Sequence, residues 1–218
     1  MAALDVIVSW PRFADFPRWR QFIREERERF GKVFVVFTKH DGPDMTGWIR
    51  ANFPEATFID SPDRGARDWR TVAVNAALDA STAEHVWFTE QDFTITDPAV
   101  WDYADGLAGI PEPGNRIVHP ACIFAPRSLI DRTSRDFGPE RIDHFGRFTE
   151  ELAALAPIAL IADGWRHMQA TCEGLYLIGE GQQPKFRPDE FRGWLQDQMT
   201  AAVPLQPAWE ARARAFLA

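Results

Sequence analysis

Cysteine, long apolar runs and clustered positive charge are all scarce in this sequence. The two cysteines, Cys122 and Cys172, form no CxxC pair, which excludes that metal or redox motif and favours a reducing compartment. No stretch approaches the roughly 20 apolar residues that span a bilayer. Residues 1–8 lack the basic start and the apolar centre of a leader. We therefore expect a cytoplasmic protein with no membrane segment.

The charge of the chain argues against binding to a polyanion. The formal net charge is −8, and the lysine and arginine residues are scattered rather than clustered. A length of 218 residues with 45% hydrophobic content is typical of one domain with a sizeable core. We find no internal repeat or linker, so residues 1–218 are predicted to form a single domain. Most of its nine tryptophans are expected to fill the core.

The N-terminal part of the chain alternates between strand and helix patterns. Short runs of β-branched or aromatic residues recur, and segments with apolar residues at helical spacing separate them. The predicted strands are 5–10, 32–38, 56–60 and 85–89. This alternation is typical of βαβ units. We therefore predict an α/β fold with a mostly parallel central sheet and helices on both faces.

The pattern is less regular after Asp97-Pro98. A helix is predicted from there to Leu107, and two more over 127–132 and 147–156. Short strands are predicted at 116–118, 121–124, 158–162 and 175–178. The fold of this half is therefore predicted in less detail than that of the first.

Polar segments follow the predicted strands at the edge where open α/β sheets bind their ligands. They are Ser9-Trp10-Pro11-Arg12, Lys39-His40-Asp41, the segment from Asp60 to Arg64, and Glu90-Gln91-Asp92. The last has two acids directly after a hydrophobic strand, where we expect them to lie in the open. Paired carboxylates bind hard cations such as Mg²⁺ or Mn²⁺, which in turn bridge phosphate oxygens. The alternative is a solvated turn with a capping acid.

The segment around these acids resembles a known family. Asn75 lies within Ala73-Val74-Asn75-Ala76-Ala77-Leu78, and it precedes Asp92 by seventeen positions. Motif, spacing and the intervening strand resemble the GT-A glycosyltransferases, in which an Ala-Arg-Asn-x-Gly-Leu helix leads into a strand and an Asp-x-Asp motif. The resemblance implies a GT-A (Rossmann-like) fold. In that fold residues 1–95 would bind a nucleotide sugar and residues 96–218 the acceptor.

The resemblance also implies roles on the donor side. Asp92 would hold the divalent ion, Mn²⁺ or Mg²⁺, while Glu90, which replaces the first Asp of the motif, would bind the ion or the sugar hydroxyls beside Gln91. Val74 replaces the family arginine and cannot reach a phosphate. Arg70 or Arg67 on the same helix is therefore expected to pair with the diphosphate; a solvated helix face is the alternative.

A pocket for the nucleotide base is implied at the end of the first strand and in the loops after the second and third. Ser9, Trp10 and Arg12 belong to this region, and Trp10 either stacks on the base or fills the core. Asp60, or else Asp41, would accept a hydrogen bond from the base or the ribose. These residues complete the predicted donor site.

The acceptor side resembles the family more faintly. No Glu-Asp pair occurs where inverting members keep their base, so Asp143 is predicted to act as the base, with His144 and Glu150 as alternatives. His167 either joins the ion, because several GT-A families add a late histidine ligand, or is an ordinary polar histidine.

These features predict a metal-dependent glycosyltransferase of the hexosyltransferase class that uses a nucleoside diphosphate sugar, UDP-sugar foremost, and a hydroxyl acceptor. The acceptor is open among small molecules, glycans and a hydroxymethylated pyrimidine of phage-type DNA, although the acidic charge argues against DNA. One alternative is a nucleotidyltransferase acting on a sugar phosphate, but residues 9–13 lack the glycine of its loop. The other is a non-catalytic sugar-nucleotide-binding module, which need not retain the paired acids.

Overall fold

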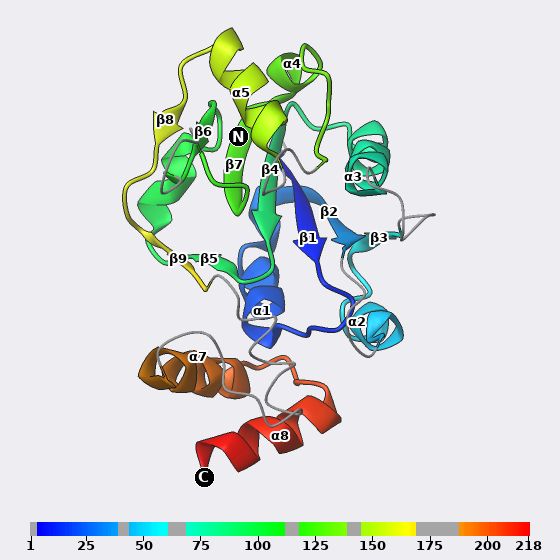
Figure 1. Ribbon diagram of the computed structural model, residues 1–218, viewed down its shortest axis with the longest axis vertical. Coiled ribbons are helices and arrows are strands. Elements are labelled where there is room, and N and C mark those ends of the chain that lie inside the picture. The colour runs from blue at the N-terminus through cyan, green and yellow to red at the C-terminus, as the bar shows by residue number, and fades with distance from the viewer. Residues whose placement is uncertain (1–3, 39–43, 61–68, 112–117, 139–144, 169–187) are drawn as a thin grey trace.

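The structure, a computed structural model, describes residues 4–38, 44–60, 69–111, 118–138, 145–168 and 188–218, except for the side chains of Trp69 and Pro188 (Figure 1). A seven-stranded sheet with the order β3-β2-β1-β4-β7-β6-β8 forms its centre. A separate ribbon pairs β5 with β9.

The first half of the sheet is parallel. Its strands are β1 (Leu4–Trp10), β2 (Phe30–Phe37), β3 (Thr57–Ile59) and β4 (His85–Glu90). The helices between them are α1 (Pro17–Glu25), η1 (Arg27–Arg29), α2 (Thr46–Asn52) and α3 (Trp69–Ala80). All four strands agree with the sequence prediction to within a few residues, and an α-helix lies between each strand and the next, as the alternating pattern predicted. The carboxyl ends of the four parallel strands meet at one edge of the sheet, as βαβ connections require.

The second half of the sheet contains a strand that runs the other way. β7 (Cys122–Pro126) is antiparallel to β4 and to β6 (Ala108–Gly109), and β8 (Ala159–Leu160) pairs with β6 in parallel. Because Cys122 at the start of β7 pairs with Thr89 near the end of β4, the segment leading into β7 lies at the carboxyl end of β4. This brings a part of the second half to the predicted ligand-binding edge.

Alternating side chains of the strands form two hydrophobic cores, one on each face of the sheet. In β1, Val6 and Val8 belong to one core and Ile7 to the other. The first core includes residues of α1, α7 (Pro188–Thr200) and α8 (Pro207–Leu217); the second includes residues of α3, α4 (Arg127–Ile130) and α5 (Gly146–Leu155). The prediction of a mostly parallel sheet covered on both faces is confirmed.

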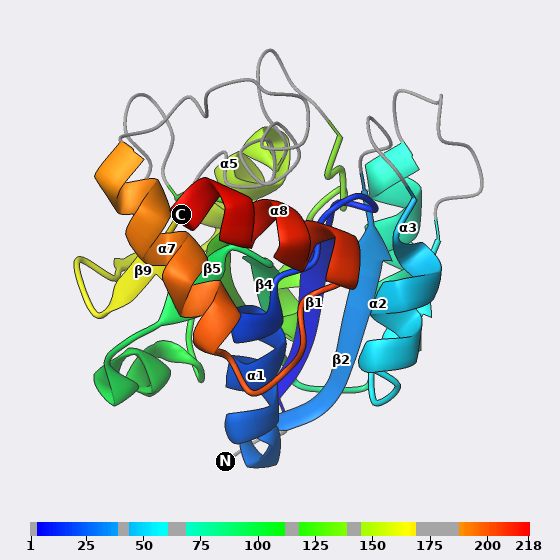
Figure 2. The same cartoon turned by 90° about the horizontal axis from the view of Figure 1, so that it is seen from below.

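The sequence did not predict two C-terminal helices, of which α7 packs beside α1 and α8 packs beside α7. Figures 1 and 2 place α7 and α8 toward the end to which β1 and β4 run. Arg20 of α1 is fully buried and bonds to Asp15 at 2.8 Å and to the carbonyl oxygen of Pro204 at 2.8 Å, while the amide of Gln206 donates to Asp15. Burial raises the pKa of Asp15 and lowers the pKa of Arg20, and their mutual attraction opposes both shifts. A buried ion pair therefore ties the C-terminal segment to α1.

The ribbon of β5 (Phe93–Ile95) and β9 (Trp165–His167) was also absent from the prediction. A tight turn precedes β9, in which Gly164 has φ +79°, and its carbonyl oxygen accepts from the amides of Thr96 and Asp97 at 2.8 and 3.0 Å. A Cβ atom at Gly164 would lie 2.8 Å from Cγ2 of Val100. Only glycine meets both demands without strain.

Several other expectations differ from the structure. The predicted helix up to Leu107 is a short 3₁₀ helix, η2 (Pro98–Tyr103). Six of the eight tryptophans whose side chains are described are buried, as expected. The predicted strand 175–178 and most of 116–118 lie outside the described residues. Among the described helices, none has the length and apolar content to cross a bilayer.

Candidate metal centre

The carboxyl end of β4 carries the three polar residues that the sequence singled out. Glu90 ends the strand beside Ser9 of β1 in the register of the sheet. Gln91 and Asp92 form the turn into β5, and only 4% and 9% of their surfaces are exposed. The expectation that both acids lie in the open is wrong for Asp92. The β5–β9 ribbon covers Asp92, because β5 directly follows this residue and pairs with β9.

The ribbon brings His167 to these two acids. His167 pairs with Phe93, and the amide of Met168 donates to the carbonyl oxygen of Asp92 at 3.1 Å. Its Nε2 atom lies 3.3 Å from Oε2 of Glu90 and 3.5 Å from Oδ1 of Asp92. The structure thus brings together all three residues predicted to bind a metal.

The three side chains form a charge-paired cluster. Burial alone would lower the pKa of His167, but the carboxylates of Asp92 and Glu90 raise the pKa to about 10. Burial would raise the pKa of Glu90, but His167 outweighs this effect, with a smaller contribution from Arg70, and holds the pKa below its usual value. The protonated imidazole therefore balances negative charge that a cation would otherwise neutralise.

The donor atoms suit a divalent ion. Two carboxylates and one imidazole are a ligand set that Mn²⁺ accepts readily and Mg²⁺ accepts through its oxygen atoms. Nε2 of His167 is buried and makes no hydrogen bond of ordinary geometry to the described residues, although it faces both carboxylates. This position fits a metal ligand better than a hydrogen-bonded structural histidine.

The comparisons with known proteins concern the fold. No family model matches the sequence, and no curated protein matches it. The crystal structure of glucosyl-3-phosphoglycerate synthase from Mycobacterium tuberculosis matches with a TM-score of 0.55 at 16% identity, over 84% of this chain and 82% of that chain. Its complex with Mn²⁺, UDP-glucose and phosphoglyceric acid matches with a TM-score of 0.52 at 14% identity, over 84% and 81%. The chain has the GT-A fold.

Within this GT-A fold a second histidine, missed by the sequence reading, stands beside the centre. The rings of His119 and His167 have centroids 4.7 Å apart, and His119 is 6% exposed. One potential ligand atom each from Glu90, His119 and His167 lie within 4.8 Å of one another. His119 lies two residues before the start of the predicted strand 121–124, so the knowledge that this strand is antiparallel to β4 would have placed His119 here.

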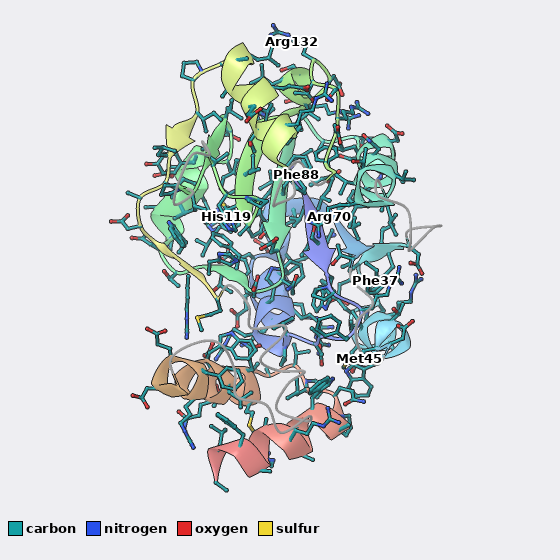
Figure 3. All side chains as sticks on the ribbon, viewed as in Figure 1. Phe37, Met45, Arg70, Phe88, His119 and Arg132 are labelled. Atoms are coloured by element: carbon teal, nitrogen blue, oxygen red, sulfur yellow. The ribbon has the colours of Figure 1, made fainter. Side chains whose placement is uncertain are left out.

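Helix α3 contributes Arg70 to the surroundings of the centre. This residue is in the first turn of α3, is 5% exposed, and is close enough to help hold the pKa of Glu90 low. Figure 3 labels Arg70 and His119 in the central part of the molecule. The predicted role of Arg70 toward a diphosphate is compatible with this placement. Arg67, the alternative, lies outside the described residues.

Two further predicted donor-site residues meet each other. Arg12 follows β1, is 1% exposed, and forms an ion pair with Asp60, which follows β3 and is partly exposed. Its guanidinium lies over the ring of Phe37, with Cζ 5.6 Å from the centroid. Nε and Nη1 of Arg12 make no hydrogen bond to the described residues. Both atoms are buried, so Asp60, which is partly exposed, is the member of this pair that can face a ligand.

Trp10 does not serve as a stacking platform. It is fully buried, donates from Nε1 to the carbonyl oxygen of Ala14 at 2.7 Å, and packs edge-on against Trp19. A ring with no exposed surface cannot stack on a base, so the structure corrects this prediction in favour of a core role.

Asp143 and His144 lie outside the described residues, as does the loop with Asp41. Glu150 is exposed on α5, and its neighbour Glu151 accepts from the amide of Ser134 at 2.6 Å and from Arg147 at 3.0 Å.

A small cavity of about 20 Å³ adjoins Asp92 and Gln91. Its lining includes Arg18 of α1, Arg166 of β9 and Trp194 of α7. Helix α7 therefore contributes to the surroundings of the metal centre.

Proposed function

We propose that this protein is a metal-dependent glycosyltransferase that moves a sugar, a hexose, from UDP to a hydroxyl group of an acceptor. The observation that carries the proposal is the convergence of Glu90, Asp92 and His167 at the carboxyl end of β4. A GT-A fold alone is shared by many reactions, so the argument rests on this site.

Asp92, Glu90 and His167 would hold Mn²⁺ or Mg²⁺. The ion supplies positive charge to the diphosphate that leaves when the sugar is transferred. The solved structure of the mycobacterial synthase with Mn²⁺ and UDP-glucose supports a divalent ion and a uridine donor for a chain of this fold.

The residues of this chain have separate tasks toward the donor. Arg70, whose charge helps to hold the pKa of Glu90 low, would pair with phosphate oxygens, which a guanidinium binds through two parallel hydrogen bonds. Ser9 lies next to Glu90 in the sheet. Asp60, held in place by the buried Arg12, would bind the nucleoside end. Gln91 is buried in the turn between the two acids and would orient them.

The acceptor side belongs to residues 96–218, and residues 1–95 bind the donor. In this proposal the two halves act as one unit, because His167 of the second half would bind the same ion as Asp92 of the first, from which it lies 3.5 Å away. We retain Asp143 as the general base. Small molecules, glycans and modified DNA bases remain the acceptor classes, and the net charge of −8 disfavours DNA. A cytoplasmic location accompanies the proposal and rests on the low cysteine content.

A thermal-shift screen of nucleotide sugars with and without Mn²⁺ tests the proposal, because a ligand that binds the folded state raises the melting temperature. We expect UDP-sugars to stabilise the protein only with the ion, and Asp92→Asn to remove the effect. The proposal fails if no nucleotide sugar at millimolar concentration shifts the transition and calorimetry detects no binding.

A further inference from the structure

His119 is held firmly at the entry to β7. Its amide donates to the carbonyl oxygen of Ile110 at 3.0 Å, and its carbonyl oxygen accepts from the amide of Cys122 at 3.3 Å. The side chain is also held, because Nδ1 accepts from the backbone amide of Ala121 at 3.0 Å. The backbone around it therefore fixes the ring in place beside His167 and Glu90.

The hydrogen bond from Ala121 determines which nitrogen of His119 carries a proton. A neutral imidazole has one N–H donor and one nitrogen with a lone pair. Since Nδ1 uses its lone pair to accept the amide proton, Nε2 must carry the hydrogen. A metal ligand needs a free lone pair, so neither nitrogen of His119 is available to an ion in this arrangement.

We propose that His119 serves the centre as an N–H donor that positions the carboxylate of Glu90, and that it is not a metal ligand. The role toward a bound ion rests on the proposed function, whereas the tautomer of His119 can be tested without it. Distance alone would include His119 in a three-ligand site with Glu90 and His167, because their ligand atoms lie within 4.8 Å. The amide of Ala121 argues against that site. A donor beside a ligating carboxylate fixes its orientation, as partners of metal ligands commonly do.

The tautomer can be observed directly by NMR on the full chain labelled with ¹⁵N-histidine. The sequence has five histidines, and the signals of His119 and His167 are identified by their loss in His119→Gln and His167→Gln. We expect the Nε2–H form for His119 in the ion-free protein. On addition of Zn²⁺, which is diamagnetic, a nitrogen of His167 should show the shift of a bound metal while His119 keeps its tautomer. An Nδ1–H form, or a coordination shift at His119, would overturn the proposal.

Mn²⁺ affinity, measured by calorimetry without nucleotide, tests the positioning role. His119→Ala should weaken binding about tenfold. His119→Gln should stay within about threefold of wild type, because its amide nitrogen can replace Nε2–H as a donor. His85→Gln, at the opposite end of β4 from Glu90, is the matched control and should bind normally. Unchanged affinity in His119→Ala, or equal losses in the Ala and Gln variants, would contradict the role.

The two measurements separate this inference from the function itself. A wild-type protein that binds no divalent ion would refute the metal-dependent transferase, while the tautomer of the ion-free protein still decides the state of His119. Circular dichroism of each variant shows whether the fold is retained.

Discussion

His167 and Asp92 come from opposite halves of the chain, yet Nε2 of the histidine lies 3.5 Å from Oδ1 of the acid. The β5–β9 ribbon produces this proximity, because it pairs Phe93 with His167 and bonds Met168 to the carbonyl oxygen of Asp92. The turn at Gly164 sets where β9 begins. Metal binding should therefore depend on a residue that touches no ion.

Gly164→Ala tests this dependence. The new methyl group would collide with Val100 and Asp97, and φ +79° is unfavourable for alanine, so the ribbon should shift and the unfolding free energy should fall by about 1–3 kcal/mol. Mn²⁺ affinity, measured by calorimetry, should fall as well. Gly193→Ala is the control, since a Cβ there meets nothing within 4 Å and the site is inside α7; it should be neutral or slightly stabilising. Equal Mn²⁺ affinity in Gly164→Ala and wild type would show that the ribbon does not position His167.

The sequence predicted the parallel half of the fold because its signals are local. Strand and helix patterns alternate without interruption from residue 4 to residue 90. The positions of Glu90 and Asp92 could be predicted because these residues stand at the end of β4 and just after it. The ribbon was not predictable in the same way, because β5 and β9 have three residues each and are defined by pairing across the chain. His119 was missed because its place depends on the direction of β7, and strand direction leaves no local pattern. Trp10 was ambiguous for a related reason, since aromatic residues at strand ends serve cores and ligands alike.

The buried pair of Asp15 and Arg20 should dominate the attachment of the C-terminal helices. Arg20→Ala leaves Asp15 buried without its cation, so the unfolding free energy should fall by about 3–5 kcal/mol in urea titrations. Replacing both residues by apolar ones, as in Asp15→Leu with Arg20→Met, should cost less than the single change, because no unpaired charge remains. Arg24→Ala, which breaks the partly exposed pair with Glu55, should cost at most about 1 kcal/mol. If Arg20→Ala were as mild as Arg24→Ala, the pair would not hold the helices.

Asp131 should contribute stability that depends on pH. Its slight burial would raise its pKa, but Arg127 and Arg135 hold the pKa below the ordinary value of 3.8. A carboxyl group whose pKa is lower in the folded state stabilises the fold above its unfolded pKa, and this stabilisation is lost as the pH falls through the folded pKa. The side chain is 46% exposed, so solvent screening limits the effect to about 1 kcal/mol or less. Urea denaturation of wild type and Asp131→Asn should therefore differ near neutral pH, and the difference should shrink as the pH falls below the ordinary pKa of an aspartate. A difference that grew toward low pH would reverse the assigned sign.

The decisive prediction for the proposed function concerns Asp92. Asp92→Asn keeps the shape of the side chain, which matters because Asp92 is nearly buried, but removes one charge from the ligands of the ion. Mn²⁺ affinity should fall, and sugar transfer or donor hydrolysis should slow by roughly a hundredfold or more, which corresponds to about 3 kcal/mol of transition-state stabilisation. Glu90→Gln should be milder if Glu90 contacts the sugar and comparably severe if it binds the ion, so the pair of variants ranks their roles.

The test of this prediction measures turnover against Mn²⁺ concentration for wild type, Asp92→Asn and Glu90→Gln. Asp102→Asn, an exposed acid in η2, is the matched control and should behave as wild type. Circular dichroism and thermal melting separate a lost ligand from a lost fold. A folded Asp92→Asn with full activity, or a wild type indifferent to EDTA, would remove the metal from the reaction. Glu90, Gln91 and Asp92 would then contact the donor without an ion.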